Sequence, residues 1–233
     1  MMASFSSLRY PARFGPTNIG PLWAAIFYGV PLTNVAVHLA WLLALHPVFS
    51  SLPINRRRLS DLLHRYFMLS PSDPRLLTLL TSAFSHIQPL HLFVNMSTYK
   101  TYVESFYLLG VSPIRFILLA IGSGLAASYA HIYTASRRRG AKSTVERTAV
   151  GASGVLAGLG TALACMFPTL KVRLSGTNQM LPLRVVVLGM FAVDAYCLST
   201  DRETGVGHAG HIGGALFGLT YFLWRKAIGA WNL

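Results

Sequence analysis

Charged residues are scarce in this sequence, and acidic residues are the scarcest. Only 12% of its 233 residues are charged, with 20 Lys and Arg against 7 Asp and Glu. A soluble globular domain carries about 25% charged residues, so one small soluble core does not accommodate this composition. The hydrophobic content of 53% excludes intrinsic disorder. A membrane protein with several spans remains, and the length suits about six helices of roughly 20 residues.

The sequence also lacks the marks of several other classes of protein. The two cysteines, Cys165 and Cys197, both lie in apolar runs, which excludes a disulfide scaffold. No heptad or Gly-X-Y period is present, so coiled coil and collagen are excluded. The net charge of +13 would suit a protein that binds nucleic acid. The basic clusters at 56–58 and 137–139, however, lie between apolar runs, and no nucleic-acid-binding motif accompanies them. Such clusters are typical of loop ends at lipid headgroups, so we expect a lipid bilayer as partner and no nucleic acid.

The apolar runs predict an all-α, polytopic membrane protein. One domain of six transmembrane helices is expected over residues 21–226, with spans at about 22–45 (bent at Pro31), 88–109, 113–135, 148–166, 181–199 and 206–224. The connection 46–87 is expected to be partly helical and to lie in the membrane interface, because its apolar residues are too interrupted to span. Residues 1–20 form a basic tail that resembles a mitochondrial presequence and equally a membrane-flanking tail. A short C-terminal tail, 227–233, follows the domain.

Three sets of polar residues stand at the starts of alternate predicted helices. They are His86, His91 and Asn95 before and within the second span; Gly151, Ser153 and Gly154 of GASG in the fourth; and His208 and His211 of GHAGHIGG in the sixth. Polar groups at membrane depth are expensive and are therefore candidates for function. Alternate helices begin on the same side of the membrane, and each group lies within about 10 Å of its helix start. We therefore expect the three sets to meet at one depth.

Together these residue types favour acyl transfer. Ser153 needs a base to become a nucleophile, and His211 or His208 can supply one. The negative oxygen of a tetrahedral intermediate needs preorganised donors. The backbone N–H of Ser153 at a helix N-terminus is one such donor, and the side chains of His91 and Asn95 are others. The predicted reaction is peptide hydrolysis within the bilayer.

Glycines at a spacing of four residues support this arrangement. Gly154 and Gly158 lie on the fourth predicted span, and Gly210, Gly214 and Gly218 lie on the sixth. Small residues at this spacing allow membrane helices to approach closely. A serine on one helix could then reach a histidine on the other.

The sequences HIQPLHLFVN, GASG and GHAGHIGGALFG, in this order, resemble those of the rhomboid intramembrane serine proteases. The resemblance covers residues 20–226. It implies a nucleophile, Ser153, and a general base, His211, that form a dyad without a carboxylate. It also implies an oxyanion hole of His91, Asn95 and the Ser153 amide, and supporting roles for His86, His208, Gly151 and Gly154. The implied substrates are transmembrane proteins, and neither a cofactor nor a metal is implied.

Within the family, SAFSH and HAGHIGGALFG look most like the mitochondrial, presenilin-associated branch. A Trp-Arg pair that is usual in bacterial and secretory members is replaced here by Leu77 and Thr78, which also favours that branch. The resemblance thus implies the mitochondrial inner membrane more than a secretory membrane. Family members admit substrates laterally, and the interrupted span 181–199 is the predicted gate.

Two alternatives remain open. One is a catalytically silent rhomboid-like protein that binds membrane clients. The other is a metal site or transporter built on His86, His91, His208 and His211, although no carboxylate is predicted to join these histidines and the HExxH motif of metalloproteases is absent. Asp194 has no assigned role; pairing with Arg184 or Lys100, or lining a water cavity, are the interpretations considered.

Overall fold

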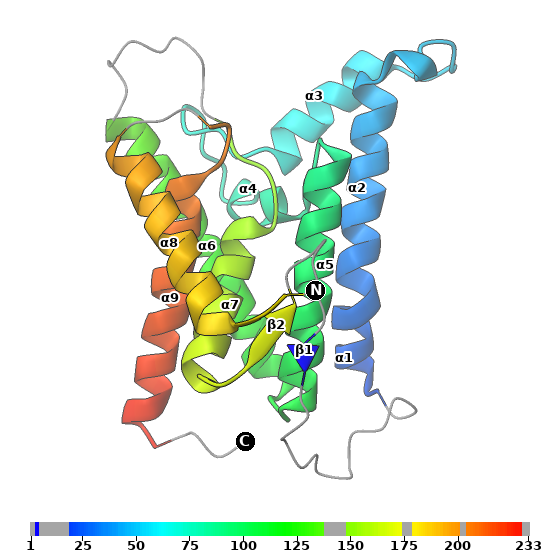
Figure 1. The fold of residues 1–233 in the computed structure, drawn as a ribbon. Coiled ribbons are helices and arrows are strands. Elements are labelled where there is room, and N and C mark those ends of the chain that lie inside the picture. Colours follow the sequence, from blue (N-terminus) through cyan, green and yellow to red (C-terminus); the bar gives the residue numbers. More distant parts are fainter. Residues whose placement is uncertain (1–2, 5–18, 138–147, 174–178, 201–203, 230–233) are drawn as a thin grey trace.

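Long helices make up most of the chain (Figure 1). The structure, a computed structural model, describes residues 3–4, 19–137, 148–173, 179–200 and 204–229. Its helices are α1 (Pro21–Ala24), α2 (Val30–Leu45), α3 (Arg56–Phe67), α4 (Thr78–Thr81), α5 (Pro89–Leu108), α6 (Pro113–Arg137), α7 (Ser153–Met166), α8 (Leu183–Ser199) and α9 (His208–Ala227). Each predicted span therefore contains a helix, and the connection 46–87 is partly helical as predicted. The basic tail 1–20 and the loop cluster at 137–139 lie largely outside the described residues.

The first predicted span is continuous but irregular. A π-helical turn, Ala25–Gly29, joins α1 to α2, and Pro31 is the second residue of α2. A proline ring clashes with the carbonyl four residues before it, which here belongs to Phe27 inside the π-helical turn. The wider turn thus takes up the irregularity that was expected at Pro31.

The fourth predicted span begins later than expected. Its helix, α7, starts at Ser153 and not at residue 148. Ala149 instead forms an isolated antiparallel bridge with Leu69, and Gly151 has φ +116°. A positive φ cannot continue into a right-handed helix, so Gly151 fixes the helix start at the serine.

A small antiparallel sheet departs from the all-α prediction. Its strands β1 (Ala3–Ser4), β2 (Lys171–Arg173) and β3 (Met180–Pro182) are arranged in the order β1-β2-β3. Val172 pairs with Leu181 at the centre of the β2–β3 ladder. Strands of two or three residues are too short to show an alternating hydrophobic pattern, which explains why the sequence did not indicate them.

Helix α7 is central to the fold. It packs against α5, α6, α8 and α9, and in Figure 1 it lies between the α2–α5 pair and the group of α6, α8 and α9. Leu159, Ala162 and Leu163 of α7 are fully buried. A smaller apolar cluster of Val37, Trp41 and Leu63 joins α2 to α3.

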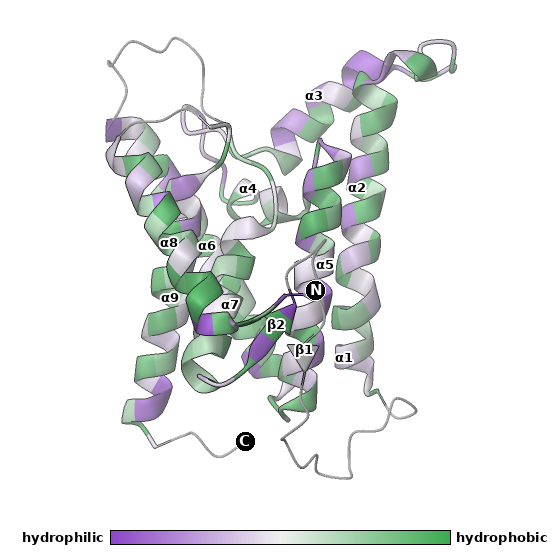
Figure 2. Cartoon of the chain, in the orientation of Figure 1, coloured by the Kyte–Doolittle hydropathy of each residue, from purple (hydrophilic) through white to green (hydrophobic). Residues whose placement is uncertain are grey.

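Large apolar side chains cover much of the outer surface. Figure 2 shows apolar stretches along the long helices and more polar residues on α3. Exposed apolar residues on α2, α6, α8 and α9 include Leu32, Leu39, Leu118, Tyr129, Leu188, Val193, Leu216 and Leu223. Lys100 and Glu104 of α5 form the ion pair that their spacing allows.

Two helical stretches among the described residues, Pro21–Leu45 and Pro113–Arg137, are long and apolar enough to cross a membrane. With the apolar surface they indicate a membrane protein. Helix α7 has 14 residues, about 21 Å at 1.5 Å per residue, which is shorter than a bilayer core of about 30 Å. The six-span arrangement therefore stays a prediction.

Candidate active site

Glycines bring α7 and α9 into backbone contact. A Cβ added to Gly214 would lie 1.9 Å from the carbonyl oxygen of Gly154, and one added to Gly218 would lie 2.1 Å from that of Gly158. No side chain larger than hydrogen fits at these distances. The close approach predicted from the glycine spacing is thus present.

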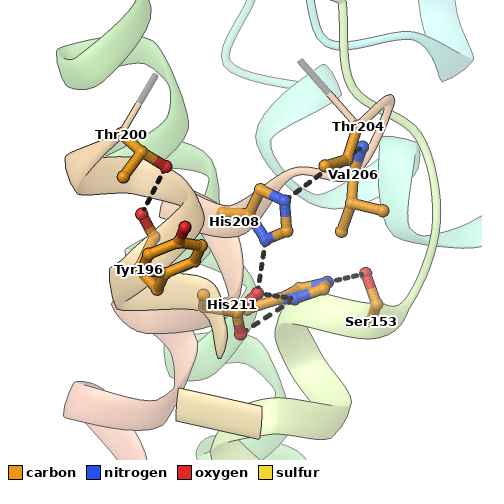
Figure 3. Close-up of polar contacts among 8 residues, drawn as sticks. Ser153, Tyr196, Thr200, Thr204, Val206, His208 and His211 are labelled. Carbon is orange, nitrogen blue, oxygen red and sulfur yellow. Dashed lines mark hydrogen bonds and ion pairs between the residues drawn. The ribbon is translucent and has the colours of Figure 1, made fainter. Parts of the chain in front are cut away.

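This contact places the serine and the histidine together. Ser153 is the first residue of α7 and His211 is the fourth of α9. The Ser153 Oγ lies 2.8 Å from His211 Nε2, as Figure 3 shows. The hydroxyl can therefore donate to the imidazole, in the geometry that a nucleophile and its base require.

A carboxylate joins the histidines, which the sequence analysis did not predict. Asp194 of α8 is buried, and its two oxygens lie 3.1 and 3.2 Å from His211 Nδ1. Its Oδ1 also lies 2.6 Å from His208 Nδ1. Asp194 had no assigned role; pairing with Arg184 or Lys100, or lining a water cavity, were the interpretations considered, and its partners here are the two histidines. The dyad without a carboxylate is wrong as a description of the geometry.

The hydrogen bonds define the tautomers of both histidines. An ionised carboxylate only accepts hydrogen bonds, so Nδ1 of His208 and Nδ1 of His211 both donate to Asp194. His211 Nε2 is then free to accept from Ser153. His208 Nε2 in turn accepts from the hydroxyl of Thr204 at 2.6 Å (Figure 3). Each ring nitrogen of the two histidines thus has a hydrogen-bond partner.

The same three side chains have metal-ligating atoms. One atom each from Asp194, His208 and His211 lies within 4.8 Å of the other two. A cation there would have to displace both Nδ1 protons. In the hydrogen-bonded arrangement, each of these atoms already has a partner.

His86 supports the turn that precedes Ser153. Its Nε2 lies 3.3 Å from the backbone N–H of Ala152, from which it accepts. Burial, helped by nearby His91 and His38, lowers the pKa of His86 to about 3. It is therefore neutral at any working pH and keeps its acceptor. Nδ1 of His38, on α2, lies 2.7 Å from the carbonyl oxygen of His86 in the connection before α5.

His91 packs over Gly151. A Cβ added to Gly151 would lie 2.5 Å from Cε1 and 2.9 Å from Nε2 of the His91 ring. The His86 and His91 rings are 4.9 Å apart between centroids. The first glycine of GASG thus supplies both the positive φ and the space for a histidine against the turn.

Asn95 lies one turn further along α5 and is buried. Its Nδ2 donates to the His91 carbonyl oxygen at 2.9 Å. A side-chain amide has two N–H donors, so this bond uses one of them. His86, His91 and His211 therefore meet around the turn at Ser153. The hydrogen bond of Asn95 is made within its own helix.

A substitution on α9 tests whether the backbone contact fixes the site. We expect Gly214→Ala to destabilise the protein by about 1–3 kcal/mol, the usual range for overpacking, because the methyl group must push α9 away from α7. The melting temperature in detergent should fall. Gly189→Ala on α8 is the matched control, since its added Cβ meets nothing within 4 Å. Equal melting temperatures for the two variants would contradict the contact.

Comparisons with known proteins agree with the motifs. A Rhomboid domain family model matches residues 73–226. This chain belongs to the rhomboid family. This rhomboid is also similar to presenilin-associated rhomboid-like protein A, mitochondrial, of Danio rerio, with 29% identity over 185 residues. The match covers 70% of this chain and 43% of the relative, so the chain spans less than half the relative's length. The resemblance to the presenilin-associated branch is thereby confirmed.

Proposed function

We propose that this rhomboid is an intramembrane serine endopeptidase that cleaves transmembrane segments of other proteins. The observation that carries the proposal is the 2.8 Å contact between Ser153 Oγ and His211 Nε2. The Asp194 carboxylate at the opposite nitrogen of the ring adds to it. A nucleophile, a base and an orienting carboxylate in sequence are the arrangement that serine hydrolases on several unrelated folds use.

The chemistry proceeds through an acyl-enzyme. Ser153 Oγ attacks the scissile carbonyl carbon while its proton moves to His211 Nε2. The tetrahedral intermediate then collapses, the C–N bond breaks, and His211 returns the proton to the leaving nitrogen. A water molecule, deprotonated by His211, releases the acyl group and regenerates the serine. Asp194 stabilises the imidazolium that forms in each half of the cycle.

The developing oxyanion is assigned three donors. They are the Ser153 backbone N–H at the N-terminus of α7, where the helix dipole is positive, and the side chains of His91 and Asn95. The contact of His91 with Gly151, and the burial of Asn95 one turn further along α5 with one N–H not used by its bond to His91, support this assignment. His86, Gly151 and Gly154 support the turn, and no cofactor takes part.

Removing an oxyanion donor should slow turnover without weakening substrate binding. We expect His91→Ala and Asn95→Ala each to lower kcat by about 10²–10³, with KM nearly unchanged. The double variant should lose less than the product of the two effects, because the donors act as a unit. Steady-state kinetics on a transmembrane substrate measure this, with exposed His64→Ala as control. Unchanged kcat in both single variants would remove them from the site.

Activity-based labelling tests the function itself. A fluorophosphonate probe should label the purified wild-type protein in detergent and fail to label Ser153→Ala. His211→Ala should also fail, whereas His208→Ala should label slowly. Absence of labelling in a wild-type protein that is demonstrably folded would argue against a serine hydrolase.

We further infer six membrane spans and a mitochondrial inner-membrane location. Apolar outward faces and buried polar groups such as Asn34, Ser123 and Asp194 support the first inference. The mitochondrial relative supports the second. Transmembrane proteins and lipids are then the partners. Fractionation of cells that express the full chain, followed by carbonate extraction, distinguishes an integral inner-membrane protein from other locations.

A second candidate function is client binding without cleavage. The Danio rerio relative is named a rhomboid-like protein and not a protease, which favours this alternative. The two functions differ in one measurement. A silent binder would retain an intact transmembrane client equally in wild type and Ser153→Ala, whereas a protease would retain it only in the variant.

A further inference from the structure

Asp194 contacts two histidines, and the proposed reaction uses only one of them. Its Oδ1 is 2.6 Å from His208 Nδ1 and 3.1 Å from His211 Nδ1. His208 is buried at the first position of α9, with 9% of its surface exposed. The shorter of the two contacts is therefore made by the residue that has no part in proton transfer to Ser153.

Thr204 contacts the ring nitrogen of His208 that does not face Asp194. Its hydroxyl oxygen accepts from the backbone N–H of Val206 at 3.3 Å. The same oxygen lies 2.6 Å from His208 Nε2, to which the hydroxyl donates when Nε2 carries no proton. In a neutral imidazole, an Nε2 that accepts leaves the proton on Nδ1, which lies 2.6 Å from the Asp194 carboxylate.

We propose that His208 and Thr204 are positioning residues that hold the Asp194 carboxylate in the orientation His211 needs. The inference rests on the proposed function and assigns it two further residues. A carboxylate with one hydrogen-bond donor can rotate about its Cβ–Cγ bond. Two donors on one helix, three residues apart, fix both its rotation and its distance from α9. His208 acts on His211 only through Asp194.

This role predicts a pattern that a purely structural role does not. His208→Leu keeps an apolar side chain at the buried position but removes the donor to Asp194. His208→Asn keeps a donor, because the asparagine Nδ2 occupies about the place of histidine Nδ1. We expect kcat to fall roughly 10- to 100-fold in His208→Leu, the effect of losing a hydrogen bond to a charged group, and to recover in large part in His208→Asn. KM should change little in either variant.

Thr204 offers a second test with little effect on the stability of the protein, because its side chain is exposed. Thr204→Val removes the hydroxyl and keeps the shape, so we expect a loss of roughly 10-fold in kcat. Thr204→Ser restores the hydroxyl and should recover most of it. Thr220→Val on α9 is the matched control, since its exposed hydroxyl bonds only the helix carbonyl of Leu216.

A double-mutant cycle decides between the interpretations. In an Asp194→Asn background, His208→Leu and Thr204→Val should cause no further loss of kcat, because the residue through which they act is already altered. Multiplicative losses in that background, or His208→Asn as slow as His208→Leu, would overturn the positioning role. Wild type and Ser153→Ala are measured in parallel. Cleavage that does not depend on Ser153 refutes the proposed function, whereas Ser153-dependent cleavage with multiplicative losses refutes the positioning role alone.

Discussion

Replacing Ser153 with alanine is expected to lower kcat by about 10⁶-fold, the loss seen when a serine hydrolase loses its nucleophile. The hydroxyl is the group that His211 contacts at 2.8 Å, and alanine leaves nothing at that position to attack the substrate. Cleavage of a transmembrane substrate in liposomes by the purified variant measures the loss. Membrane insertion and melting temperature should be unchanged, because the side chain is small.

The base provides the control for this prediction. His211→Ala should lose about as much activity as Ser153→Ala, and the double variant should be no worse than either, because the two residues act as one unit. Residual cleavage near the wild-type rate in Ser153→Ala would refute the nucleophile. Full activity in His211→Ala would refute the base and leave the serine without an activator.

Replacing Asp194 with asparagine is expected to lower kcat by about 10⁴-fold, as the same exchange does in other Ser-His-Asp sites. The asparagine amide can present N–H to His211 Nδ1, which would then accept instead of donate. The ring proton would move to Nε2, and Nε2 could no longer accept the Ser153 proton.

Kinetics at saturating substrate measure this prediction, with exposed Asp61→Asn on α3 as control. Fluorophosphonate labelling should slow in parallel with peptide cleavage, since both need the activated serine. A kcat close to wild type in Asp194→Asn would show that the carboxylate, 3.1 Å from His211 Nδ1, does not contribute to catalysis. The dyad implied by the rhomboid resemblance would then suffice.

The helices were predictable because apolar runs of helical length leave few alternatives in a chain this poor in charge. The residues at which the helices begin were harder to predict. Helix α7 begins at Ser153 because Gly151 has a positive φ, and one glycine among 20 carries no sequence mark of that conformation. The strands were not predictable, because their register depends on segments that are far apart in the sequence, such as Ala3 and Val172.

The sequence predicted the site residues that lie close to a helix start, and it missed the one that lies far from them along the chain. Ser153, His91 and His211 each lie near a helix start, so alternation of helices was enough to bring them together. Asp194 reaches the histidines from the far side of the connection between α8 and α9, 14 and 17 residues away. A usable signal did exist: a lone carboxylate in an apolar span needs a partner, and the neighbouring helix offered two histidines.

The helix that carries Asp194 differs from the two that carry Ser153 and His211. Helices α7 and α9 touch through their backbones, so the serine and the histidine cannot separate. Helix α8 is an outer element whose buried residues are Leu183, Asp194 and Cys197. An outward shift of about 1 Å in α8 would lengthen the bond to His211 beyond hydrogen-bonding range, while the bond to Ser153 would stay intact. If α8 is the predicted gate and an entering substrate holds it outward, we therefore expect Ser153 to be activated only after α8 has returned.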